Sequence, residues 1–100
     1  MTKSHQITPS QPVNTASLGA SAIEFLECLQ NASGSTSLEI DLSSTETPDS
    51  GTIKFLLAAA NDCRQRGFSP GVRATGKTAE LLRLLNMDQH LALNTGEVSK

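Results

Sequence analysis

Apolar residues recur at helical spacing in two long stretches of the chain. Between residues 14 and 31 the stripe consists of Leu18, Ala22, Phe25, Leu26 and Leu29. Between residues 51 and 66 it consists of Ile53, Leu56, Leu57, Ala60 and Cys63. Gly67 follows the second stretch, at a position where a left-handed residue commonly ends a helix. Both patterns predict amphipathic helices that bury one face.

A shorter stretch between these two helices alternates instead. Leu38, Ile40 and Leu42 fall on one side, and Glu39 and Asp41 fall on the other. Alternation with a period of two predicts a strand with one buried face and one polar face. A polar second face favours a sheet that helices cover on one side only.

The rest of the chain gives weaker signals. Ile7 is the centre of a short N-terminal strand, expected at a sheet edge, and Val72–Ala74 is a second candidate strand. Residues 77–87 predict a helix after the cap Thr75, and Leu91 and Leu93 indicate one further short element. The residues of the predicted helix 77–87 that we expect to face inward are Thr78, Leu81, Leu82 and Leu85.

The alternation of strands and helices predicts the fold class. An order of strand, helix, strand, helix, strand, helix favours a small α/β domain with a mainly parallel sheet and right-handed crossovers. At 100 residues the chain is one domain over 1–100. We expect residues 1–5 and 95–100 to be disordered at its two ends.

Charge and composition exclude several classes of function. The net charge of −2 comes from eight basic and ten acidic residues, dispersed along the chain. Without a basic run there is no electrostatic basis for binding nucleic acid or an anionic membrane. No apolar run is long enough to span a bilayer, and the N-terminus lacks the apolar core of a secretory signal. We therefore expect a cytoplasmic protein with no direct membrane insertion.

Residues that carry out catalysis or bind metals are sparse. His5 and His90 are the only histidines, and neither lies beside a nucleophile at a predicted strand-to-helix turn. Cys28 and Cys63 fall inside predicted helices, without a second ligand at metal-binding spacing. We expect both to be reduced thiols that are mostly buried. The sequence thus predicts no enzyme activity, no metal site and no cofactor.

One segment matches the phosphate-binding loop pattern G-x-x-x-x-G-K-[ST] by its letters. It runs from Gly71 to Thr78 and includes Gly76 and Lys77. Such a loop requires a buried strand directly before its first glycine, and the residues before Gly71 are Arg66-Gly67-Phe68-Ser69-Pro70. Because Val72–Ala74 are themselves the strand candidates, we interpret this match as a chance one. Nucleotide binding is a third and weaker hypothesis.

The polar cluster Asp49-Ser50-Gly51-Thr52 opens the second long helix. Asp, Ser and Thr are favoured at helix starts, because their oxygens accept hydrogen bonds from free backbone N–H groups. By itself, therefore, the cluster indicates helix capping. The spacing between this cluster and the preceding strand, however, matches the pattern of a known family.

From Leu38 to Leu91 the sequence resembles the STAS domain, found in bacterial anti-sigma factor antagonists and in the cytoplasmic tails of sulfate transporters. The family pattern is a strand ending in Asp-Leu, seven residues to an Asp, and then Ser-Ser-Gly-Leu opening an apolar helix. Here Asp41-Leu42 ends the strand, and seven residues lie between Asp41 and Asp49. Gly67 lies at the family's glycine after that helix. Leu84-Leu85-Asn86-Met87-Asp88 is similar to the closing Leu-x-Gly-Leu-Asp, with Asn86 at the glycine.

Two departures accompany this resemblance. The family's opening hairpin is reduced to one weak strand, so this is a short version of the domain. The second serine of the family pattern, the usual phosphoacceptor, falls on Gly51 in an ungapped comparison. Ser50 matches the first hydroxyl position, and Thr52 takes the place of the family glycine.

The resemblance implies a non-enzymatic protein-interaction module in bacterial signalling, similar to an anti-sigma factor antagonist. Its partner would be an anti-sigma factor, a kinase of the histidine-kinase-like ATPase fold or another signalling protein. We expect docking through the helix start and the exposed side of the helix, with phosphorylation at Ser50 or Thr52 as an optional switch. The alternative is a structural STAS subunit of a membrane transporter or chemotaxis-type complex, with no phosphoswitch. The expected docking residues are Asp49, Ser50, Gly51, Thr52, Lys54, Phe55 and Ala58.

Overall fold

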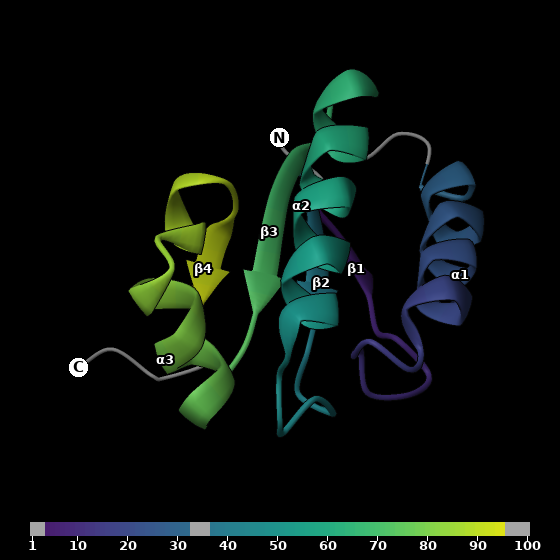
Figure 1. Cartoon of the computed structure of the whole chain (residues 1–100). Coiled ribbons are helices and arrows are strands. Elements are labelled where there is room, and N and C mark those ends of the chain that lie inside the picture. The colour runs from purple at the N-terminus through teal and green to yellow at the C-terminus, as the bar shows by residue number, and fades with distance from the viewer. Residues whose placement is uncertain (1–3, 33–36, 96–100) are drawn as a thin grey trace.

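Four strands form one sheet in this computed structural model, which describes residues 4–32 and 37–95 (Figure 1). They lie side by side in chain order, and every pair of neighbours is parallel. The strands are β1 (Ser4–Ile7), β2 (Ser37–Asp41), β3 (Ser69–Arg73) and β4 (Ala92–Asn94). The helices are α1 (Leu18–Gln30), α2 (Ser50–Gln65), α3 (Gly76–Leu84) and the 3₁₀ helix η1 (Met87–Gln89). The predicted α/β class with a parallel sheet is confirmed.

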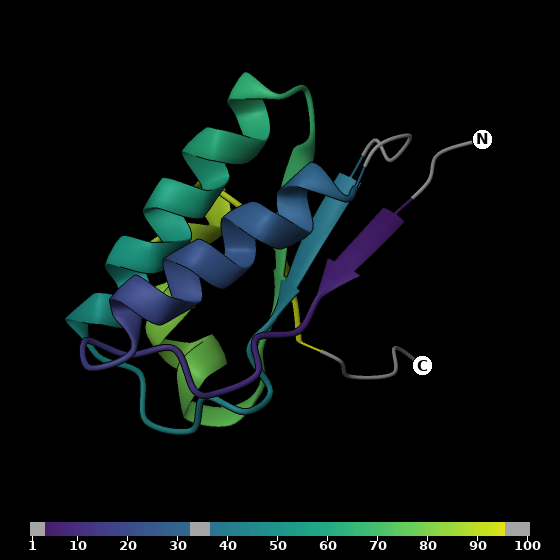
Figure 2. The ribbon, with the colours of Figure 1, turned by 90° about the vertical axis from the view of Figure 1, so that its right-hand side faces the viewer.

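The helices cover one face of the sheet. Successive strands are both neighbours and parallel, so right-handed crossovers place each connecting helix on the same side. Figure 2 shows this arrangement, with α1 and α2 side by side on one side of β1 and β2. The predicted one-sided sheet is therefore confirmed, and the opposite face is open.

The register of the strands aligns one apolar row across the sheet. Ile7 pairs with Ile40, Ile40 with Val72, and Val72 with Leu93. The first three side chains are buried and Leu93 packs against them, so this row is the sheet's contribution to the core. The alternation of Leu38 and Ile40 with polar residues thus predicted the buried face of β2 correctly.

The open face carries a polar cluster centred on Glu39. Its carboxylate accepts hydrogen bonds from Gln6 Nε2 at 3.0 Å and from Asn94 Nδ2 at 3.2 Å. Arg73 Nε lies 3.4 Å from Glu39 Oε1 and completes an ion pair. One side chain of β2 therefore connects to all three other strands.

Two strand boundaries differ from the predictions. β3 begins at Ser69 rather than at Val72, and so includes Pro70. Proline is tolerated there because β4 pairs only from Gly71 onward, which leaves Pro70 without a neighbour on that side. β1 is an edge strand, as predicted, but it already includes residues 4 and 5, which we expected to be disordered. Residues 1–3 and 96–100 of the same prediction lie outside the described residues.

The buried face of α2 is rotated relative to the prediction. Leu56, Ala60 and Cys63 are buried as expected, but Leu57 is 41% exposed, and Phe55 is 3% exposed. The reason is that α1 packs directly against α2, where Phe55 meets Phe25 edge to face at 5.7 Å. A groove, rather than a helix, lies on the other flank, where Ile53 and Lys54 line it. The buried arc of α2 therefore extends toward α1 and not toward α3.

Helix α3 is shorter and less buried than predicted. It ends at Leu84 instead of Met87, and only Thr78, Ala79 and Leu82 are buried within it. Leu85, expected to face inward, is 48% exposed. Asn86 then adopts a left-handed conformation with φ of 57°, which turns the chain into η1. Asparagine tolerates this conformation better than most residues.

Candidate functional site

The start of α2 is organised by the carboxylate of Asp49. Its Oδ1 accepts hydrogen bonds from the backbone N–H groups of Gly51 at 2.9 Å and Thr52 at 3.2 Å. The Thr52 hydroxyl accepts one in return from the Asp49 N–H, which completes a capping box. The capping function that the sequence indicated for this cluster is confirmed.

A second segment of the chain crosses this helix start. The Thr15 N–H donates to both Asp49 oxygens, at 3.0 and 3.1 Å, and the Gly51 N–H donates to Thr15 Oγ1 at 3.2 Å. These backbone donors, Thr15 first, keep the pKa of Asp49 below its ordinary value. Three N–H groups thus converge on one carboxylate, and the loop before α1 is fixed to the start of α2.

Gly51 is required by this crossing. A Cβ at position 51 would lie 2.4 Å from the backbone nitrogen of Thr15 and 2.5 Å from its Cα. It would also lie 2.7 Å from the carbonyl carbon of Asn14. All three atoms belong to the backbone, so a rotamer change cannot relieve the clash. The glycine that the resemblance aligns with a phosphoserine therefore has a structural cause within this chain.

The Thr52 hydroxyl is committed to the interior. It donates to the carbonyl oxygen of Val13 at 2.6 Å, and its side chain is 0% exposed. The Val13 N–H donates to Thr45 Oγ1, and the Thr78 hydroxyl donates to the Thr45 carbonyl oxygen. These bonds join the loops after β1 and β2 to the starts of α2 and α3. A kinase could reach Thr52 only if this hydroxyl left the interior, which disfavours Thr52 as a phosphoacceptor.

Besides the capping residue Asp49, Ser50 and Lys54 are exposed polar residues of the helix start. Both line a groove of about 550 Å³ between α2 and α3, together with Pro48 and Asp49. The apolar lining of the groove consists of Ile53, Leu81 and Leu85. An apolar hollow thus opens directly beside the accessible Ser50 hydroxyl.

The structure divides the predicted docking residues into three groups. Asp49, Ser50 and Lys54 lie together at the α2–α3 groove. Ala58 is exposed on the flank that faces α1. Gly51, Thr52 and Phe55 are buried, so the expectation that Phe55 lies on the exposed side of the helix is wrong.

Sequence reasoning missed the apolar part of the groove. Ile53, Leu81 and Leu85 were assigned to the core because they fit the helical stripes. One signal was available in the sequence. Leu84 and Leu85 at the end of the nine-residue α3 add more apolar residues than one face of so short a helix can bury. The sequence alone did not indicate that α2 and α3 stand apart.

The segment that matches a phosphate-binding loop has another structure. Gly71 lies inside β3, paired with Glu39 on one side and Ala92 on the other. Thr78, at the position of the magnesium-binding hydroxyl, is buried and donates to the Thr45 carbonyl oxygen. A strand cannot also form the cradle, so the letters of this motif describe a strand followed by a helix start.

Comparison with family models, with curated proteins and with solved structures finds no match to this chain. Within residues 4–32 and 37–95, no helix is both long enough and apolar enough to cross a membrane. In the same part of the chain, no three His, Cys, Asp or Glu side chains gather in a way that would suit a metal ion. The functional argument therefore depends on the geometry of the site and on the sequence resemblance.

Proposed function

We propose that this chain is a STAS-like, non-enzymatic protein-interaction module of bacterial signalling, similar to an anti-sigma factor antagonist. The observation that carries the proposal is the apolar groove between α2 and α3, which opens beside the exposed Ser50. Ile53, Leu81 and Leu85 form its apolar lining, and Leu85 is 48% exposed. Exposed apolar surface gathered around a groove is typical of a binding site for another protein.

Two backbone conformations support the resemblance. Asn86 stands where the family has glycine, and its φ of 57° is a conformation that glycine adopts readily. Gly67, at the family's glycine after the helix, has a φ of 85°. In both places the residue type of the pattern agrees with a left-handed turn of the chain.

The partner in this proposal is an anti-sigma factor, a kinase of the histidine-kinase-like ATPase fold or another cytoplasmic signalling protein. Ser50 is the phosphoacceptor candidate that remains, because its side chain is exposed. It lies one turn before Lys54 on the same helix, so a phosphate there would pair with the Lys54 ammonium. Nearly two negative charges would then lie at the mouth of an apolar groove, where they oppose docking.

Constitutive docking is the second candidate, as a structural STAS subunit of a membrane transporter or chemotaxis-type complex. The packing of Gly51 against the backbone of Thr15 favours it, because no hydroxyl can occupy the family's phosphoserine position. Thr52 offers no replacement, since its hydroxyl is bonded inside the fold. In this form the same groove binds its partner without a switch.

The test uses a purified candidate partner encoded near the gene, such as a kinase of the histidine-kinase-like fold. Isothermal titration compares the wild-type chain with Leu85→Glu, which places a carboxylate in the groove. Desolvating that charge costs at least about 1–3 kcal/mol, so we expect binding to weaken tenfold or more. Leu26→Glu is the matched control, because Leu26 is a similarly exposed leucine on α1 that does not line the groove. Equal affinities for wild type and Leu85→Glu would contradict docking in this groove.

The switch is tested separately. Incubation of the chain with the kinase and ATP, followed by intact mass measurement, should show one added phosphate that Ser50→Ala abolishes. If the wild-type mass does not change although the complex forms, the constitutive form of the proposal holds.

A further inference from the structure

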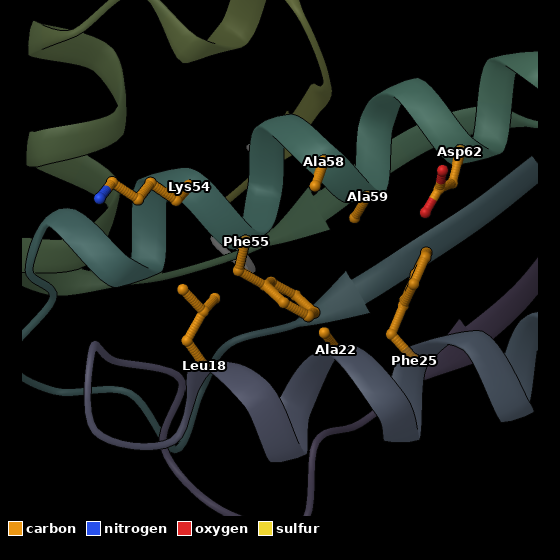
Figure 3. Close-up of a pocket in the computed structure, with 8 residues that line it drawn as sticks. All are labelled: Leu18, Ala22, Phe25, Lys54, Phe55, Ala58, Ala59 and Asp62. Carbon is orange, nitrogen blue, oxygen red and sulfur yellow. The ribbon is translucent and has the colours of Figure 1, made fainter.

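A second groove lies on the opposite flank of α2, between α2 and α1. It has a volume of about 310 Å³, and apolar side chains line most of it. Figure 3 shows Leu18 and Ala22 pointing from α1 toward α2, and Phe55 and Ala58 on the facing side. Lys54 is the one residue that lines both grooves, and the inference drawn from this surface does not depend on docking at the α2–α3 groove.

Small residues leave this groove open. Ala22 on α1 and Ala58 and Ala59 on α2 have no atoms beyond Cβ with which to fill the space between the helices. Beneath them, Phe25 and Phe55 meet edge to face and close the floor. The two helices therefore touch through their aromatic rings and diverge above them, which leaves an apolar hollow on the surface.

The walls of the groove determine which kind of segment can occupy it. Apart from Leu18, the first residue of α1, the lining residues lie within the helices, where backbone N–H and C=O groups are already hydrogen-bonded. An extended peptide laid there would find no backbone partners, and its own polar groups would be desolvated at a cost. A helix satisfies its backbone internally, and alanines on the receiving side allow close approach of its axis.

Charges at the two ends of the groove specify the occupant further. Lys54 lies at one end and Asp62 at the other, as Figure 3 shows. They are eight residues apart on α2, which corresponds to about 12 Å along the helix axis. A docked helix of similar direction would present an acidic side chain to Lys54 and a basic one to Asp62. These two charges would be seven or eight residues apart, with apolar residues between them.

We propose that the α1–α2 groove binds an amphipathic helix of a partner protein, whose apolar stripe has one acidic and one basic side chain about two turns apart. Recognition is by helix-in-groove docking, with the apolar stripe over Ala22, Ala58 and Phe55. Ala58, which sequence analysis assigned to a single docking surface, belongs to this second one.

Three synthetic peptides of about 20 residues serve as probes, long enough for alanine-rich helices to form. All carry the same leucine and alanine stripe. One has a glutamate and a lysine seven residues apart, one has two glutamates, and one has two lysines. Binding to the isotope-labelled full chain is followed by NMR, through the shifts of the backbone amides of Ala22 and Ala58.

We expect the mixed-charge peptide to bind the wild-type chain most tightly and to shift these amides. Ala58→Glu fills the groove with a carboxylate and should weaken binding at least tenfold, whereas Ala20→Glu should have no effect. Ala20 is an exposed alanine of α1 that does not line the groove. Asp62→Lys leaves two cations along the groove, so the preference should change to the peptide with two glutamates.

Three results would overturn the proposal. These are no binding of any peptide below about 1 mM, equal affinity for all three peptides, or an unchanged affinity in Ala58→Glu. None of them affects docking at the α2–α3 groove, which Leu85→Glu tests. Conversely, a chain that fails the Leu85→Glu test can still bind the mixed-charge helix here.

Discussion

Replacing Gly51 with alanine tests whether the crossing of residues 14 and 15 over α2 is as close as the structure shows. The new Cβ would lie within 2.4–2.7 Å of three backbone atoms, where about 3.4 Å is an ordinary contact. To restore normal contact distances, the loop must move outward by roughly 1 Å. The perturbation is therefore a displacement of the loop before α1, and not a loss of core packing.

The cost follows from the hydrogen bonds that this displacement breaks. The Thr15 N–H bond to the Asp49 carboxylate is lost, although water screens this exposed, charged acceptor. The bond from the Gly51 N–H to Thr15 Oγ1 contributes about 1 kcal/mol. Alanine recovers up to about 1 kcal/mol, because it is a better helix former than glycine. Forcing extra atoms into filled space typically costs about 1–3 kcal/mol, and we expect a net loss of that size in the free energy of unfolding.

Urea unfolding followed by far-UV circular dichroism measures this loss, with Gly19→Ala as the matched control. Gly19 and Gly51 each occupy the second position of a helix, but a Cβ at Gly19 would meet nothing within 4 Å. Gly19→Ala should therefore stabilise the fold slightly, while Gly51→Ala lowers the melting temperature by about 5–20 °C. If Gly51→Ala is as stable as Gly19→Ala, the crossing is not as close as described and the structural explanation for Gly51 is refuted.

Three further predictions concern buried and titrating groups. Thr52→Val should lose about 1–3 kcal/mol of stability in urea unfolding, whereas Thr52→Ser should lose less, because it retains the hydroxyl that Val13 and Asp49 bond. The pKa of Asp49 is lower in the folded state than its ordinary value of 3.8. The ionised carboxylate therefore stabilises the fold fully above pH 3.8, and this stabilisation is lost as the pH falls through the pKa of the folded state. Unfolding from pH 7 to pH 2 should therefore show an acid limb that Asp49→Asn flattens. Burial raises the pKa of Cys63 to about 11, so iodoacetamide at pH 8 should modify the half-buried Cys28 first, and a faster reaction at Cys63 would contradict its burial.

Much of the fold could be predicted because periodicity reports burial directly. The alternation around Leu38 and Ile40 identified β2 and its buried face, and the stripe through Leu56 and Cys63 identified α2. Gly67 marked the end of that helix, and its positive φ shows why glycine is there. These signals are local, since each depends only on the period of one element.

The site could not be predicted in full because it depends on contacts between distant segments. Nothing local to Thr52 indicates that its hydroxyl meets the carbonyl oxygen of Val13, which is 39 residues earlier. The resemblance aligns Gly51 with a phosphoserine. The reason for a glycine at this position is its close contact with the backbone of Thr15, which is also remote in sequence. The separation of α2 from α3, which exposes Leu85, likewise follows from how the helices are spaced over the sheet.

The most direct test of the central claim, docking at the α2–α3 groove, is photo-crosslinking in living cells of the native host. A photoreactive amino acid replaces Leu85 in the groove or, as a control, Gln30 at the exposed end of α1. The account predicts one dominant adduct from position 85, with a signalling protein of the proposed class, and none of that adduct from position 30. No adduct at position 85, or the same adduct at both positions, would contradict it.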